Sequence, residues 1–236
     1  MKEEMYEMCK RDQYVNWWFR ARREIIYKCL RKYIYRNINA LEIGAGYGVM
    51  TSMLKSFGEV QTIEPYLDAV DYLKDNLGIN AYAGTLNTFG VTEKYDLVAC
   101  FDVLEHIADD KAALIKMESL LKDHGLLVLT VPAYKFLWGK HDELHGHLRR
   151  YTRESLIEKV PSSLSIKKAS YFNTLLFPVA LLDRLFFSKN KKSYSLNPNE
   201  LINCILYIIF SIEKYIVPWI SLPFGVSIIL IAKKGM

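Results

Sequence analysis

The sequence predicts a single α/β domain built on a mainly parallel sheet, and three observations lead to that prediction. Short apolar segments alternate with helical segments through the first half of the chain, as in repeated strand–helix–strand units. A length of 236 residues, 51% of them hydrophobic, suits one core and is short for two ordinary domains. A glycine-rich string at residues 44–48 follows the first apolar segment, where open α/β sheets bind their ligands.

The elements are predicted in order from the start of the chain. An aromatic and basic segment indicates an N-terminal cap helix, placed at residues 10–36. Short apolar runs predict strands at 38–43, 60–63, 79–83, 96–101, 125–131, 164–172 and 224–232. Helices are predicted at 49–57, 66–77, 109–121 and 153–160, the last capped by Thr152. Right-handed crossovers between parallel strands then place helices on both faces of the sheet.

Two regions interrupt this alternation. Residues 132–151 are polar and aromatic, and they are interpreted as a long loop. Residues 173–223 are apolar and broken by four prolines, which predicts a helical insertion before the last strand. The whole chain, 1–236, is interpreted as one domain that carries the cap helix and this insertion.

Composition excludes several classes of function. The net charge of +5 is mild and the basic residues are dispersed, so a nucleic-acid partner is not expected. The four cysteines contain no CxxC pair, so neither a zinc site nor a disulfide framework is expected, and a reducing cytoplasm fits best. The polar start of the chain does not resemble a signal peptide.

The glycine string and one carboxylate indicate a nucleotide-like cofactor. The spacing is GxGxG, and Val49 stands where a dinucleotide fingerprint would have its third glycine. Glu64 follows the second predicted strand, where a carboxylate can accept hydrogen bonds from both hydroxyls of a ribose. These residues alone leave NAD and S-adenosylmethionine (SAM) both open.

Three motifs together resemble the class I SAM-dependent methyltransferases: LEIGAGYG at 41–48, Glu64, and YDLVACFDVLEHI at 95–107. They are most similar to the broad small-molecule branch, methyltransferase types 11 and 12, which includes ubiquinone and menaquinone methyltransferases. The resemblance covers residues 38–160 and the final strand. It implies a three-layer Rossmann-like fold of seven strands, the last antiparallel, and SAM as the cofactor.

The same resemblance implies roles for single residues. The glycine turn wraps the methionine part of SAM, and residues 17–23 either cover the cofactor or pack on the sheet edge. A carboxylate that family members often place near the adenine amine is missing here, and Leu86 stands in that region. The cofactor-binding residues implied are Glu42, Gly44, Ala45, Gly46, Gly48, Glu64, Pro65, Leu86, Asp102 and Val103.

Methyl transfer to a hydroxyl or amine usually needs a base. The candidate catalytic residues are His106, His141 and His145, and the alternative for His106 is that it holds a loop. Arg149, Arg150 and Tyr151 are candidate substrate-binding residues, and the alternative for the two arginines is a surface patch before a helix. The histidines of residues 141–147 match no zinc motif, so no metal is expected.

The predicted function is SAM-dependent methylation of a small molecule, such as a sugar, a glycan or a lipid-linked intermediate. The alternative is a SAM-binding scaffold without transfer activity, and an NAD-dependent oxidoreductase is a third, weaker interpretation. The insertion 173–223 either is buried as a lid or homodimer contact or lies in a membrane interface. In the second case Lys189, Lys191 and Lys192 face anionic lipid, and the protein is cytoplasmic but peripheral to the membrane.

Overall fold

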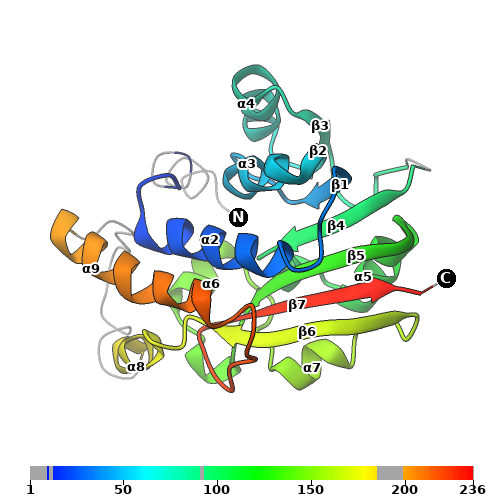
Figure 1. The fold of residues 1–236 in the computed structure, drawn as a ribbon. Helices are drawn as coiled ribbons and strands as arrows, with labels where there is room; N and C mark the ends of the chain where they lie inside the picture. The colour runs from blue at the N-terminus through cyan, green and yellow to red at the C-terminus, as the bar shows by residue number, and fades with distance from the viewer. Residues whose placement is uncertain (1–9, 11–12, 91–92, 185–198, 236) are drawn as a thin grey trace.

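The computed structural model describes residues 10, 13–90, 93–184 and 199–235, and its centre is a seven-stranded sheet. The strand order is β3-β2-β1-β4-β5-β7-β6, and β7 runs antiparallel to both of its neighbours (Figure 1). The strands are β1 (Ile38–Ile43), β2 (Gly58–Glu64), β3 (Asn80–Ala83), β4 (Tyr95–Phe101), β5 (Leu121–Pro132), β6 (Leu164–Phe172) and β7 (Ser227–Lys234). The predicted Rossmann-like sheet with an antiparallel last strand is confirmed.

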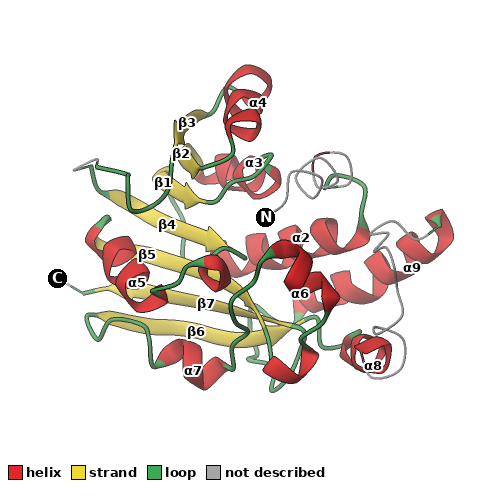
Figure 2. Ribbon diagram, turned by 180° about the vertical axis from the view of Figure 1, so that it is seen from behind, coloured by secondary structure: helices red, strands yellow, loops and turns green. Residues whose placement is uncertain are grey.

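Helices cover both faces of the sheet (Figures 1 and 2). The α-helices are α2 (Trp17–Leu30), α3 (Val49–Leu54), α4 (Leu67–Leu77), α5 (Asp110–Ser119), α6 (Lys140–His145), α7 (Arg153–Ile157), α8 (Phe177–Leu182) and α9 (Glu200–Ser211). The 3-10 helices are η1 (Lys55–Phe57), η2 (Leu104–His106), η3 (Lys135–Leu137) and η5 (Ile212–Tyr215). Thr152 caps α7 as predicted, because its side chain accepts a hydrogen bond from the backbone of Ser155.

Alternation along the central strands divides the core into two layers. In β4, Leu97 and Ala99 pack with α2, α3 and the end of α9, whereas Val98 and Cys100 pack with α5 and α7. All four side chains are fully buried, as expected for a parallel strand covered on both faces. Because β1, β2, β4 and β5 are parallel, their carboxyl ends meet at one edge of the sheet.

Apart from shifts of a few residues at the ends of elements, two predicted regions differ from the structure. The helix α2 covers only 17–30 of the predicted cap helix 10–36, because Asn16 caps its first turn and the chain turns after Leu30. The predicted loop 132–151 contains η3 and α6. The short helix α6 is bounded by Gly139, whose N–H donates to Asp142, and by left-handed Gly146.

The insertion 173–223 is helical, as predicted, over its described parts. Its helix α9 runs beside α2 (Figure 1), where Asn203 accepts a hydrogen bond from the backbone N–H of Trp17 at 2.8 Å. Lys189, Lys191 and Lys192 lie outside the described residues. Among the described residues, none of the helices combines the length and apolar character that crossing a bilayer requires.

Candidate functional site

The glycine turn between β1 and α3 is the first part of the site. Gly44, Gly46 and Gly48 all have positive φ, between 53° and 82°, which favours glycine. A Cβ on Gly44 would lie 2.3 Å from the Val103 side chain, so this glycine permits close packing against the end of β4. A Cβ on Gly46 would meet nothing within 4 Å, so the turn exposes bare backbone to open space where a ligand can approach.

Glu64, the last residue of β2, is bound directly to this turn. Its carboxylate accepts a hydrogen bond from the backbone N–H of Gly46 at 2.8 Å and another from that of Tyr66 at 3.0 Å. The residue is 1% exposed. The structure thus brings together the glycine turn and the carboxylate that the sequence indicated separately.

Glu42 on β1 is a second buried carboxyl group below the turn. It accepts a hydrogen bond from the Thr51 hydroxyl of α3 at 2.5 Å. Burial raises the pKa of Glu42 to about 8, with Glu64 contributing in the same direction. A cation bound beside Glu42 would favour its ionised form, so this position suits the amino group of a ligand.

The other cofactor-binding candidates surround the same edge of the sheet. Ala45 and Leu86 are buried, Val103 packs on the Gly44 turn, and Pro65 is exposed beside α4. Their predicted roles toward the cofactor stay predictions.

The cap helix reaches this edge through Arg22. The buried guanidinium group of Arg22 forms an ion pair with Asp102 and donates a hydrogen bond to the Thr130 hydroxyl at 2.6 Å. Asp102 itself has a left-handed backbone, with φ of 53°. Neither Arg22 nor Thr130 was predicted from the sequence, where the aromatic–basic string at 17–23 was the only available signal.

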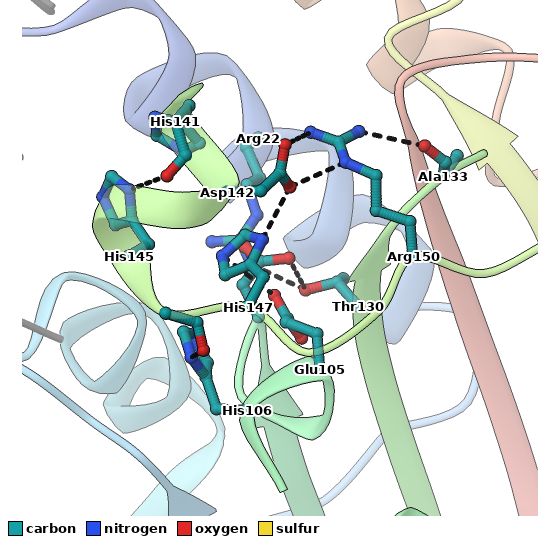
Figure 3. Close-up of polar contacts among 12 residues, drawn as sticks. Arg22, Glu105, His106, Thr130, Ala133, His141, Asp142, His145, His147 and Arg150 are labelled. Atoms are coloured by element: carbon teal, nitrogen blue, oxygen red, sulfur yellow. Dashed lines mark hydrogen bonds and ion pairs between the residues drawn. The ribbon is translucent and has the colours of Figure 1, made fainter. Parts of the chain in front are cut away.

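A cluster of titratable groups lies after β4, where η2 meets the loop that follows α6 (Figure 3). It joins Glu105 and His106 with His147, and the His106 and His147 rings lie 4.8 Å apart in an edge-to-face arrangement. The backbone N–H of Leu148 donates to the carbonyl of Glu105 at 2.9 Å, which fastens the two segments together. Burial, then the nearby Asp102, raises the pKa of Glu105 well above its ordinary value.

His106 is the only predicted catalytic histidine in this cluster. Its Nδ1 lies 3.3 Å from the carbonyl oxygen of Gly146. Burial, with a contribution from His147, lowers the pKa of His106 to about 4. The rings of His141 and His145 in α6 lie against each other at a tilt of 38°, with centroids 3.8 Å apart, and burial lowers the pKa of both.

The predicted substrate-binding residues are held by carboxylates of the chain. Arg149 pairs with Asp110 at 2.8 Å, and Tyr151 donates a hydrogen bond to the same carboxylate at 2.8 Å. Arg150 donates two hydrogen bonds to Asp142, at 2.7 and 3.1 Å. Their role toward a substrate stays a prediction, and the structure shows a second role for them in fixing the loop.

Two sequence comparisons with known proteins both find methyltransferases. A family model described as a methyltransferase domain matches residues 14–168. Ubiquinone biosynthesis O-methyltransferase from Glaesserella parasuis serovar 5 is 28% identical over 102 residues, a match that spans 38% of this chain and 43% of that protein. The chain therefore covers less than half the length of this curated relative.

Solved structures show the same fold. N-methyltransferase NodS from Bradyrhizobium japonicum WM9, in complex with S-adenosyl-L-homocysteine, aligns with a TM-score of 0.58 at 14% identity, over 92% of this chain and 88% of that one. The [4+2]-cyclase SpnF aligns with a TM-score of 0.59 at 13% identity, over 90% of this chain and 81% of that one.

Proposed function

The chain belongs to the class I SAM-dependent methyltransferases, and we propose that its acceptor is a small molecule with a lipid-like part. SAM supplies a methyl group already activated by a positive sulfur. What remains for the protein is to hold the donor, align the acceptor with the methyl group and exclude water.

For the donor, the proposal assigns the cofactor to the edge formed by β1, β2 and β4. The open backbone at Gly46 and the buried carboxyl group of Glu42 suit the methionine part, whose ammonium group would pair with Glu42. Glu64, one strand away, suits the ribose hydroxyls. The hydrogen bond between Glu64 and Gly46 is the observation that carries this assignment.

For the acceptor, an aromatic cluster at the same edge of the sheet supports an apolar group. Tyr134 follows β5 and stacks on Phe136 and Tyr171, with ring centroids 4.9 Å apart in both pairs. Phe177 contacts Tyr134 from α8. Because Arg149 and Arg150 are already paired with carboxylates, the site offers more apolar surface than free positive charge. This balance favours a lipid-linked acceptor over a free anionic sugar.

Exposed apolar residues on α9 support access to such an acceptor at a membrane surface. Leu201, Ile202, Ile205 and Ile208 lie on one side of the helix and are 46–70% exposed. The helix extends beyond the sheet at its carboxyl edge, beside α8 (Figure 1). The whole chain carries a net charge of +5, and a positively charged protein with this apolar surface suits contact with a bilayer that contains anionic lipid.

Loss of a proton from a hydroxyl acceptor needs a group near the reacting oxygen. His106, His141 and His145 come from η2 and α6, both of which follow strands whose carboxyl ends form this edge. We keep these three as the candidate bases, with His106 first because it lies in η2, the first helical segment after β4.

Incubating the pure protein with methyl-tritiated SAM and cell extracts tests the proposal. Label that enters the organic-solvent phase of a lipid extract supports a lipid-linked acceptor, whereas label confined to water-soluble products rejects it. Binding of S-adenosyl-L-homocysteine without transfer to any extract would favour the alternative, a scaffold that binds the cofactor without catalysis.

A further inference from the structure

We propose that Glu105, His106 and His147 bind a divalent first-row transition-metal ion beside the methyl-transfer site. Each side chain offers one ligand atom, and these atoms all lie within 4.8 Å of one another. One carboxylate and two imidazoles are a ligand set typical of transition metals rather than of Mg²⁺ or Ca²⁺.

Glu105 is the strongest sign of a missing partner. Its side chain is 0% exposed, and neither carboxyl oxygen has a hydrogen-bond partner among the described residues. Buried polar atoms nearly always have partners, so two unpartnered oxygens on one carboxyl group need an explanation. Figure 3 shows this side chain directed at His147.

His147 is oriented as metal-binding histidines usually are. Its Nδ1 is 2.8 Å from Asp142, which leaves Nε2 facing Glu105 at 4.0 Å. Asp142 is held in turn by Arg150 and by the backbone N–H of Gly139 (Figure 3). A carboxylate that fixes one ring nitrogen while the other is available is the common arrangement behind a metal-bound histidine.

His106 completes the set from the opposite segment. The contact of its Nδ1 with the Gly146 carbonyl fixes the ring and leaves Nε2 available. Metal–ligand bonds of about 2.0–2.2 Å place neighbouring ligand atoms roughly 3–4 Å apart, so ligand atoms that lie within 4.8 Å of one another need to approach by at most about 1–2 Å. The backbone bond between Leu148 and Glu105 already holds the two segments together.

The proposed ion would add a group that activates the acceptor, and this catalytic role rests on the proposed methyltransferase function. Three protein ligands leave coordination positions open, and the cluster lies at the end of β4, next to Asp102. An acceptor hydroxyl whose oxygen bound at an open position would release its proton more readily. With His106 bound to the ion, His141 and His145 would be the candidate bases left to accept that proton.

Titration of the metal-free protein with Co²⁺ tests the site directly, by calorimetry and by the visible absorption of the bound ion. We expect one Co²⁺ per chain with a dissociation constant below about 10 µM, and at least about tenfold weaker binding in Glu105→Gln and in His147→Asn. His124→Asn is the matched control, because His124 is exposed at the start of β5, far along the strand from the cluster, and asparagine tolerates its left-handed backbone.

Equal Co²⁺ binding in the parent and in all three variants, or no binding to the parent protein, would overturn the proposal. Glu105→Gln and His147→Asn are both tested, so that the result does not depend on the folding of a single variant. The thermal unfolding of each variant is compared with that of the parent protein to check that it folds. Titration of each protein with S-adenosyl-L-homocysteine separates the two proposals. If the parent protein binds S-adenosyl-L-homocysteine but not Co²⁺, only the metal site is wrong. If it binds Co²⁺ but not S-adenosyl-L-homocysteine, only the cofactor assignment is wrong.

Discussion

Arg22 of the first described helix forms an ion pair with Asp102, the residue that follows β4. This contact fastens α2 to the edge of the sheet where the glycine turn lies. Because the Arg22 side chain is 3% exposed and the Asp102 side chain 26% exposed, the pair is shielded from solvent on one side only. The cap helix is therefore part of the site's framework rather than an independent cover.

Replacing Arg22 by Met should destabilise the protein, since Asp102 and Thr130 would lose the guanidinium group and keep only the 3.3 Å hydrogen bond between them. We expect a loss of about 2 kcal/mol in the free energy of unfolding, less than for a fully buried pair because Asp102 is partly hydrated. Urea denaturation measures this. Arg23→Met, on the same helix, is the control and should change stability by less than about 0.5 kcal/mol. Equal losses of stability in the two variants would show that the contact of Arg22 with Asp102 does not contribute to the free energy of unfolding.

Glu64→Gln should weaken binding of S-adenosyl-L-homocysteine. The amide keeps the shape of the side chain but loses the charge that strengthens hydrogen bonds to hydroxyl groups. Charged hydrogen bonds contribute about 1.5–3 kcal/mol each, so we expect roughly tenfold to hundredfold weaker binding by calorimetry. Glu59→Gln, at the exposed opposite end of β2, should bind as the parent does. If Glu64→Gln bound S-adenosyl-L-homocysteine as tightly as the parent protein does, the assignment of Glu64 to the ribose hydroxyls would be wrong.

The sequence predicted the parts of the site that depend on local position. Gly46 and Glu64 each follow a strand, and parallel strands end at a common edge, so their meeting is a consequence of the fold class. The alternation of strands and helices predicted a mainly parallel sheet with helices on both faces, whereas the seven strands with an antiparallel last strand were implied by the family resemblance.

The remaining features depend on packing between distant segments, which no local pattern contains. The pairing of Arg22 with Asp102 joins a helix to a strand end far along the chain, and Glu105 meets His147 only because the loop after α6 folds back. The helix α6 itself has six residues, too few for hydrophobic periodicity to show.

Stability should depend on pH through Glu42. Burial raises its pKa from an ordinary value of 4.5 to about 8, so the folded protein holds this proton more tightly than the unfolded chain. The contribution to stability is therefore full below pH 4.5, falls as the pH rises and levels off above about 8.

The variant Glu42→Gln isolates this effect, since the amide cannot titrate. Measured without cofactor by urea denaturation, its stability relative to the parent should rise by a few kcal/mol, about 2 or more, between pH 5 and pH 9. A constant difference across this range would mean that Glu42 is ionised throughout. An added cofactor with a positive amino group should reduce the difference at high pH.

Glu213 should be essential to the stability of the insertion 173–223. Its fully buried carboxylate accepts hydrogen bonds from the backbone N–H groups of Asn173, Thr174 and Leu175, at 2.7, 2.7 and 2.9 Å. Glu213→Ala would leave three donors without a partner, and we expect a loss of about 3 kcal/mol in the free energy of unfolding. Thermal and urea unfolding measure it. Glu200→Gln, exposed at the start of α9, should cost less than about 0.5 kcal/mol, and a similar cost at both positions would contradict the assignment.

The exposed side of α9 should bind bilayers that contain anionic lipid. The double variant Ile205→Ser/Ile208→Ser removes two side chains that are 46% and 54% exposed, so it should leave folding intact. Each buried isoleucine contributes about 1.5–3 kcal/mol when it enters an apolar phase, so partial insertion of two predicts at least a tenfold loss of binding. Co-sedimentation with vesicles of phosphatidylcholine and phosphatidylglycerol measures it. Ile115→Ser on α5 is the matched control, because Ile115 is similarly exposed, at 52%, on the opposite face of the sheet. The parent protein could instead fail to bind these vesicles and sediment as a dimer, while the double variant sediments as a monomer. In that case the same surface would be a contact between two copies of the chain.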